Sequence, residues 1–317
     1  MQRYKWIYRP GDLARDDWET IVDATVPGWA HTGIRIGTLA NGGSLHLEPG
    51  DIERMIVPLA GSFTVQYGAD GASVTLEGRA SVFDGPTDVL YLGIHTSAVI
   101  AGSGRVAVAE APTDRELPSR YLARAEVPVE LRGAGRASRQ VHNFGTPGAL
   151  DAAKLIVCEV ITPAENWSSY PAHKHDENIP GHESRLEEIY YFESEVSRGL
   201  TAQATADPFG IFSISSSPAG EIEIDARVRT GDTVLVPFGY HGPAAAAPGY
   251  DLYYLNVMAG PDAERVWNIS DDPSQGWIRN TWNSQQIDPR LPYATPASPA
   301  TTSSTKTFSD TPEGQVR

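Results

Sequence analysis

Cysteine and positive charge are both scarce in this chain. Of its 317 residues only one is a cysteine, Cys158, and 25 lysine and arginine residues stand against 40 aspartate and glutamate residues. A single cysteine excludes an intrachain disulfide, a cysteine-based zinc ribbon and an iron–sulfur cluster. Cys158 lies in the apolar run 154–161, so we expect it to be a buried structural residue. The net charge of −15 repels phosphate backbones and anionic membrane surfaces, so we expect neither nucleic acid nor a membrane as a partner.

Long hydrophobic runs are also missing. No stretch approaches the length of a membrane span, and the first ten residues mix charges with aromatic residues instead of forming the apolar segment of a signal peptide. We therefore expect a cytoplasmic protein. Hydrophobic residues still make up 40% of the chain, which is enough for a substantial core and excludes disorder throughout.

Short apolar runs with a period of two dominate the sequence, and glycine, proline, asparagine and aspartate separate them. This pattern predicts antiparallel strands and an all-β sandwich or barrel. The predicted strands are 55–59, 62–67, 73–77, 89–92, 105–109, 154–161, 189–192, 200–204, 211–215, 221–225, 233–236 and 252–257. Short helices are expected only within 12–22 and 262–268.

A loose internal repeat divides the chain. Each half has an acidic strand start followed by a glycine-centred turn, at 53–61 and 77–86 in the first half and at 187–193 and 230–241 in the second. We predict two related β domains, 1–125 and 126–293. Residues 294–317 are mostly Ala, Pro, Ser and Thr, which predicts a polar, disordered tail.

The second half carries a cluster of metal-ligating residue types. His173 and His175 are two residues apart and would share one face of a strand, Glu187 and Glu188 open a later strand, and His241 follows a glycine-rich turn. Two imidazoles on one face, with a carboxylate and a third imidazole from neighbouring strands, would form an open site for Zn, Mn, Fe or Ni. A lone His-x-His is weak evidence; the combination predicts a catalytic site for one divalent metal, zinc first among these.

These residues resemble the two motifs of the cupin superfamily, a His-x-His with a downstream Glu and a Gly-x5-Pro-x-Gly turn with a downstream His. The resemblance implies a bicupin with two cupin-type β-barrels, and a metal held by His173, His175, Glu188 and His241. Glu188 is preferred over Glu187 because the family's ligand directly precedes the Ile-Tyr-Tyr strand. The first half lacks the motif: Asp88 aligns with His241. We expect the N-terminal cupin to be metal-free and to supply packing, a lid or a dimer surface.

Longer segments resemble the 5-deoxy-glucuronate isomerase family of myo-inositol catabolism, namely 139–145, 166–176, 186–192, 251–261 and 288–292. The resemblance implies a metal-dependent aldose–ketose isomerase that converts 5-deoxy-D-glucuronate to 5-dehydro-2-deoxy-D-gluconate. The alternatives are a 4-deoxy-uronate ketol-isomerase of pectin breakdown, a cupin dioxygenase, and a non-catalytic bicupin that binds a sugar acid. Exposed strand edges favour a homo-oligomer, a dimer or larger.

An isomerase of this class needs a base, and its anionic substrate needs local cations in an acidic protein. The candidates for the base are Glu187, Lys174, Tyr254 and His142, and the sequence does not rank them. Lys174 and Glu187 alternate with metal ligands, so they should point away from the metal, and we expect Lys174 on the surface. The candidates for substrate binding are Arg279, Arg139 and Asn256.

Overall fold

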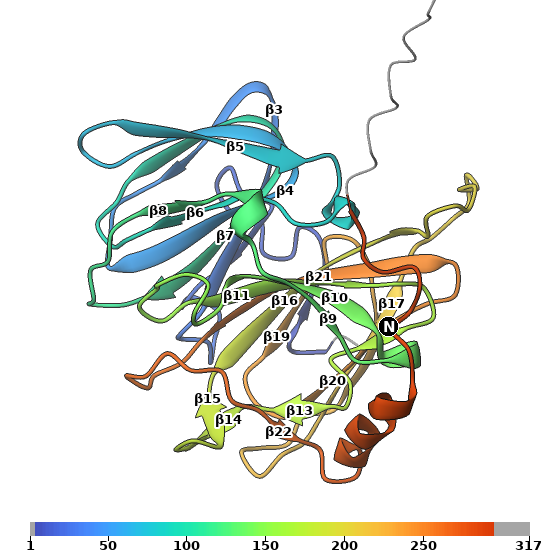
Figure 1. Ribbon diagram of the computed structural model, residues 1–317. Coiled ribbons are helices and arrows are strands. Elements are labelled where there is room, and N and C mark those ends of the chain that lie inside the picture. Colours follow the sequence, from blue (N-terminus) through green and yellow to red (C-terminus); the bar gives the residue numbers. More distant parts are fainter. Residues whose placement is uncertain (1–3, 295–317) are drawn as a thin grey trace, which may run out of the picture.

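The computed structural model describes residues 4–294, and residues 295–317 of the predicted tail lie outside this range. The described chain is built from antiparallel sheets in two units, and Figure 1 shows the first unit (blue to cyan) packed against one side of the second (green to red). The all-β prediction is confirmed.

The first unit is one sheet that curls around its own small core. Its strands, in spatial order, are β2 (Thr20–Val22), β3 (Gly33–Leu47), β7 (Ala98–Pro112), β4 (Ile52–Tyr67), β6 (Val89–Leu92) and β8 (Arg120–Leu122), and β5 (Ala72–Arg79) pairs with β4. The predicted strands 55–59 and 62–67 are parts of the one long strand β4.

The second unit has two facing sheets and a hairpin. One sheet has the order β1 (Ile7–Tyr8), β19 (Thr233–Val236), β16 (Glu187–Val196), β21 (Tyr250–Ala259), β11 (Ile156–Thr162), β10 (Arg139–Gly145) and β9 (Val129–Arg132). The other has the order β18 (Ile224–Val228), β17 (Gly210–Ser215), β20 (Tyr240–Ala246), β13 (His173–Lys174) and β22 (Ser270–Asp271), with β12 (Trp167–Ser168) beside β20. The hairpin is β14 (Asp176–Ile179) and β15 (Glu183–Arg185).

Several local predictions were wrong. Residues 12–22 and 262–268 form turns and extended chain instead of helices, and 200–204 form no strand. The helices of the described range are 3-10 helices: η1 (Val82–Asp84), η2 (Arg124–Glu126), η3 (Gly135–Ala137) and η4 (Gly276–Ser284). Strand β1 departs from the predicted division at 125, because it pairs with β19 of the second unit.

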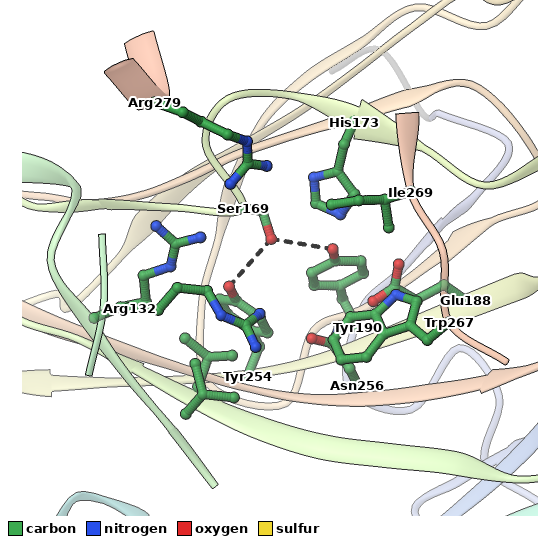
Figure 2. A pocket seen from close by; sticks show the side chains of 13 residues that line it. Arg132, Ser169, His173, Glu188, Tyr190, Tyr254, Asn256, Trp267, Ile269 and Arg279 are labelled. Atoms are coloured by element: carbon green, nitrogen blue, oxygen red, sulfur yellow. Dashed lines mark hydrogen bonds between the residues drawn. The ribbon is translucent and has the colours of Figure 1, made fainter. Parts of the chain in front are cut away.

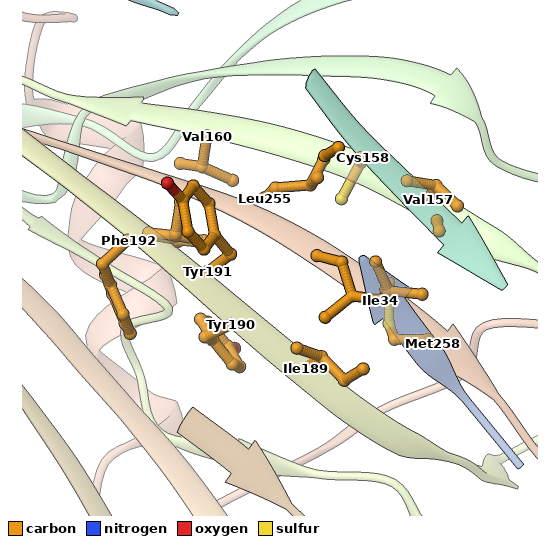
Figure 3. Packing of buried hydrophobic residues seen from close by; sticks show 14 of the residues in the cluster. Ile34, Val157, Cys158, Val160, Ile189, Tyr190, Tyr191, Phe192, Leu255 and Met258 are labelled. Atoms are coloured by element: carbon orange, nitrogen blue, oxygen red, sulfur yellow. The ribbon is translucent and has the colours of Figure 1, made fainter. Parts of the chain in front are cut away.

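The largest hydrophobic core lies between the two units. Along β4, Met55 and Val57 face this shared core, whereas Ile56 faces the core of the first unit, because alternate side chains of a strand point to opposite faces. Figure 3 shows Ile34 of β3 among Val157 and Ile189 of the second unit. Cys158 is fully buried beside them, as expected.

Carboxylates at two strand starts join the units in a reciprocal way. Glu53, at the start of β4, accepts hydrogen bonds from the amides of residues 153–155 at 2.6–2.7 Å. Glu187, at the corresponding point of β16, accepts hydrogen bonds from the amides of Ala30 and His31, the latter at 2.7 Å. The two acidic strand starts of the internal repeat therefore each bind a loop of the other unit.

Candidate metal centre and substrate cavity

The strands bring the four predicted ligands together in the second unit. His173 on β13 lies opposite His241 on β20, His175 follows β13, and Glu188 lies near the start of β16. All four are buried. The ligating nitrogens of the three histidines lie within 4.8 Å of one another, and Glu188 Oε2 is 2.9 Å from His175 Nε2 and 3.0 Å from His241 Nε2.

The backbone orients the three imidazoles. Each Nδ1 faces a carbonyl oxygen: that of Pro171 at 3.3 Å for His173, of Leu186 at 3.2 Å for His175 and of Gly239 at 3.0 Å for His241. A carbonyl oxygen only accepts, so each Nδ1 carries a hydrogen, which leaves Nε2 as the metal-binding nitrogen of each ring. His241 Nε2 has no hydrogen-bond partner among the described residues. The donor set therefore fits a divalent cation such as Zn, Mn, Fe or Ni.

The charges of the cluster suit the same ion. Burial alone would raise the pKa of Glu188, but its close contacts with His175 and His241 hold that pKa at about 2. Burial and the neighbouring His241 and His175 lower the pKa of His173 well below its usual value. Glu188 is thus anionic and His173 neutral at neutral pH, which are the forms that bind a metal.

A cavity of about 240 Å³ opens beside His173 and Glu188. Figure 2 shows the ligand side chains on one side and arginines on the other. Its wall contains Arg132, Arg139, Val141, Val160, Ser169, His173, Glu188, Tyr190, Tyr254, Asn256, Trp267, Ile269 and Arg279. This one cavity therefore includes Tyr254 and the three residues predicted to bind the substrate.

The three cavity arginines differ in their partners. Arg132 pairs with Glu130 at 2.7 Å and Arg279 pairs with Asp271 at 2.6 Å. Arg139 is buried and, within residues 4–294, donates only to backbone, to the carbonyl oxygen of Ala137 at 3.0 Å and weakly to that of Tyr170 at 3.5 Å. Burial, together with the charges of Arg132 and Arg279, lowers the pKa of Arg139 to about 10. A buried guanidinium without a carboxylate partner is a strong attractor for an anionic ligand.

Other polar groups also face the cavity. Asn256 Nδ2 and Trp267 Nε1 are buried donors that lack a partner among the described residues. Ser169 Oγ lies between Tyr190 and Tyr254. Burial raises the pKa of Tyr254 to about 12 despite hydrogen bonds that oppose the shift, so this phenol is neutral at neutral pH.

The structure places three of the four candidate bases away from the cavity. Glu187 binds the amides of Ala30 and His31. His142 lies on the opposite face of its sheet, where Nδ1 is 2.6 Å from Glu159 Oε1. As expected, Lys174 points away from the ligands. These three residues are therefore not positioned to act as the base, because alternation along their strands turns each side chain away from the cavity.

The prediction of a surface-exposed Lys174 was wrong. The hairpin β14–β15 folds over it, and Nζ lies 2.8 Å from Asp176, 2.6 Å from Glu177 and 2.8 Å from Glu183. These carboxylates raise the pKa of Lys174, although burial alone would lower it. Lys174 thus anchors the hairpin to the strand that carries His173.

Sequence reasoning missed Arg132, Ser169, Tyr190 and Trp267 as cavity residues. Ser169 and Tyr190 lie inside segments that carried the family resemblance, at 166–176 and 186–192, and could have been singled out there. Arg132 lies on β9, which was not among the predicted strands. This edge strand contributes little to the core, and its apolar residues Val129 and Leu131 are exposed.

Comparison with known proteins agrees with this geometry. Oxalate decarboxylase from Lactobacillus farciminis superposes on 84% of the chain with a TM-score of 0.57 at 10% identity, which shows a shared fold. An IolB-like protein from Salmonella typhimurium superposes on 86% of the chain and 98% of its own length with a TM-score of 0.76 at 33% identity. The fold and the histidine–carboxylate cluster define a bicupin.

The family is more specific. The model of the KduI/IolB family matches residues 6–278. The 5-deoxy-glucuronate isomerase of Geobacillus kaustophilus is 38% identical over 259 residues, which cover 79% of this chain and 87% of that protein. The enzyme of the same name from Listeria monocytogenes is 37% identical over 254 residues, 78% of this chain and 88% of that protein. The chain belongs to the KduI/IolB family.

Proposed function

We propose that this protein is an aldose–ketose isomerase that converts 5-deoxy-D-glucuronate to 5-dehydro-2-deoxy-D-gluconate with one bound divalent metal. The observation that carries the proposal is one cavity wall that contains His173 and Glu188 of the metal cluster together with Arg139, whose guanidinium has no carboxylate partner among the described residues. A sugar acid has a carbonyl at one end and a carboxylate at the other, which matches this polarity.

The metal would be held by His173, His175, Glu188 and His241, with zinc the first choice and Mn, Fe or Ni the alternatives. A Lewis acid bound there would stabilise the negative charge that develops on the substrate oxygens when a carbon-bound proton leaves. The chain's own part is to keep the imidazoles in the metal-binding tautomer through the three backbone carbonyls.

The substrate is oriented by the rest of the wall. Arg139 takes the carboxylate in a two-pronged contact, and Arg279 and Arg132 add positive charge to that end. Asn256 and Trp267 offer free N–H groups to sugar hydroxyls. Tyr254 is the one member of the four candidate bases that touches the cavity, and its neutral phenol can donate and accept a proton.

Two further properties belong to this proposal. A cytoplasmic location suits an enzyme that acts on a small soluble metabolite, and no helix in the described range 4–294 is long and apolar enough to cross a membrane. A homo-oligomer is supported by the edge strand β9, where the side chains of Val129 and Leu131 are 46% and 37% exposed. Light scattering of the purified protein measures the oligomeric state directly.

The experiment compares substrates and a ligand variant. Metal-loaded protein is incubated without oxygen with 5-deoxy-D-glucuronate and, separately, with a 4-deoxy-uronate, and products are followed by NMR. We expect faster conversion of the first, because the named relatives are 5-deoxy-glucuronate isomerases. His241→Ala should remain folded and lose both metal and turnover. Preference for the second substrate favours the alternative isomerase, and an oxygen requirement favours a dioxygenase.

A further inference from the structure

Three buried hydroxyl groups form a chain along the wall of the cavity. Ser169 Oγ lies 3.2 Å from the hydroxyl of Tyr190 and 3.1 Å from that of Tyr254. The tyrosines come from β16 and β21, whereas Ser169 comes from the loop before β13, and all three line the cavity. Figure 2 shows Ser169 between the two phenols, with His173 and Glu188 on one side and Arg132 and Arg279 on the other.

The backbone holds Ser169 in an unfavourable conformation. Its φ of +46° is in the left-handed region, which serine rarely adopts and which costs of the order of 1 kcal/mol. Gly242, next to His241, makes the close approach possible, since a Cβ atom there would lie 1.8 Å from the carbonyl oxygen of Ser169. The fold thus holds the Ser169 hydroxyl between the two phenols, although the backbone of Ser169 is strained there.

A hydroxyl can accept one proton while it donates another, whereas the arginines and the Trp267 N–H of this wall can only donate. Serine and tyrosine hydroxyls each donate one hydrogen and accept others, so Ser169 can receive a proton from one phenol while it gives its own to the other. Arginine and the tryptophan N–H only donate. Within the described cavity wall, these three hydroxyl groups are the adjoining groups that can carry a proton and remain neutral.

We propose that Tyr190, Ser169 and Tyr254 form a relay that moves the hydroxyl proton of the substrate between its two reacting oxygens. This inference rests on the proposed isomerase function. Aldose-to-ketose conversion breaks the C2–H and O2–H bonds and forms C1–H and O1–H bonds. The carbon-bound proton leaves C2 and is returned to C1 by a separate acceptor, and the relay handles the oxygen-bound proton.

The relay step balances without any charged intermediate on the protein. The O2 proton passes to the phenol at one end, that phenol's proton passes to Ser169, the Ser169 proton passes to the second phenol, and the second phenol's proton passes to O1. Each hydroxyl ends with one proton, the electron pair of O2–H forms C2=O, and C1=O becomes C1–OH. No oxidant, reductant or co-reactant is needed.

The test uses Ser169→Ala, Tyr190→Phe and Tyr254→Phe in the full-length metal-loaded protein. Ser169→Gly is a second form of the serine variant, because glycine adopts the positive φ without strain. The control is Tyr191→Phe, on the opposite face of β16. Metal content and binding of D-gluconate, a sugar acid that cannot isomerise, report whether each site is intact.

Reactions run in D2O, and NMR measures both the ketose formed and the deuterium at C2 of recovered aldose. We expect the relay variants to lose kcat by about 100-fold, with KM within about threefold, and to raise the ratio of C2 exchange to conversion by about tenfold. The control should match the wild type. Relay variants with kcat near the wild-type value, or with exchange and conversion reduced equally, overturn the relay. A wild type that binds but does not convert the sugar acid overturns the proposed function itself.

Discussion

Replacing Arg139 by methionine should weaken substrate binding while leaving the fold as stable as before or more stable. Arg139 is buried, stacks on Trp282 with its guanidinium 5.6 Å from the ring centroid, and finds only backbone oxygens to bind. Methionine retains a flexible apolar chain of similar length and removes the charge.

The magnitudes follow from the burial of an unpaired charge. The pKa of Arg139 falls from 12.5 to about 10, mainly because of burial, and this shift corresponds to roughly 3 kcal/mol of unfavourable charge burial. Methionine removes the cost of burying the charge, which raises the free energy of unfolding. It also removes the hydrogen bonds to Ala137 and Tyr170, which offsets part of this gain. The carboxylate loses two charge-assisted hydrogen bonds worth about 1.5–3 kcal/mol each, so binding should weaken by at least about 100-fold.

Urea unfolding and calorimetric titration with D-gluconate measure the two quantities. Arg79→Met is the matched control, because Arg79 is equally buried but forms a two-pronged pair with Glu159 at 2.6 Å on the far face of the sheet. It should lose about 3–5 kcal/mol of stability and keep its affinity for gluconate. The reasoning about Arg139 is refuted if Arg139→Met loses as much stability as this control or binds gluconate as the wild type does.

Three further predictions concern other buried charges. Glu188→Gln should remove the metal, whereas Glu187→Gln should keep it and lose about 1–2 kcal/mol of stability, because Glu187 binds backbone amides of the first unit; metal analysis separates the two. Lys174→Met should cost about 3–5 kcal/mol in urea unfolding, since it leaves buried carboxylates without their cation, and a change below 1 kcal/mol would refute this. Burial alone would raise the pKa of Glu159, yet Arg79 and His142 hold it at about 2, below the 4.5 expected when unfolded. Its contribution of roughly 3 kcal/mol is therefore present above about pH 4.5 and is lost as the pH falls toward 2. Unfolding at pH 7 to 3 should show Glu159→Gln less stable at pH 7 and the difference narrowing in acid, and a constant difference would count against it.

The candidate metal cluster could be predicted because each of its residues belongs to a short, recognisable sequence motif. His173 and His175 are two residues apart, and Glu188 and His241 each adjoin a strand or turn with a recognisable signature. The structure brings these four side chains together as the motif predicts. Tyr254 and Asn256 are two residues apart on β21 and both line the cavity, as alternation along a strand requires.

What failed depended on contacts between distant segments. Glu187 meets the amide of His31, 156 residues away, and Lys174 is covered by the hairpin β14–β15. Arg132 enters the cavity because β9 joins the edge of a sheet through β10. Strand β1 pairs with β19 more than 220 residues later, which no periodicity near residue 7 could reveal. Sheet order, which decides these contacts, is not encoded in the period of any single strand.

The central claim is that the His173, His175, Glu188 and His241 cluster supports isomerisation of a sugar acid. The most direct measurement follows 5-deoxy-D-glucuronate by NMR with purified protein before metal removal, after chelation, and after zinc or manganese is restored. We expect the ketose to accumulate with the metal-loaded protein, to stop accumulating after chelation and to accumulate again when the metal is restored. Binding of the sugar acid without conversion, or an equal rate from metal-free protein, would contradict it.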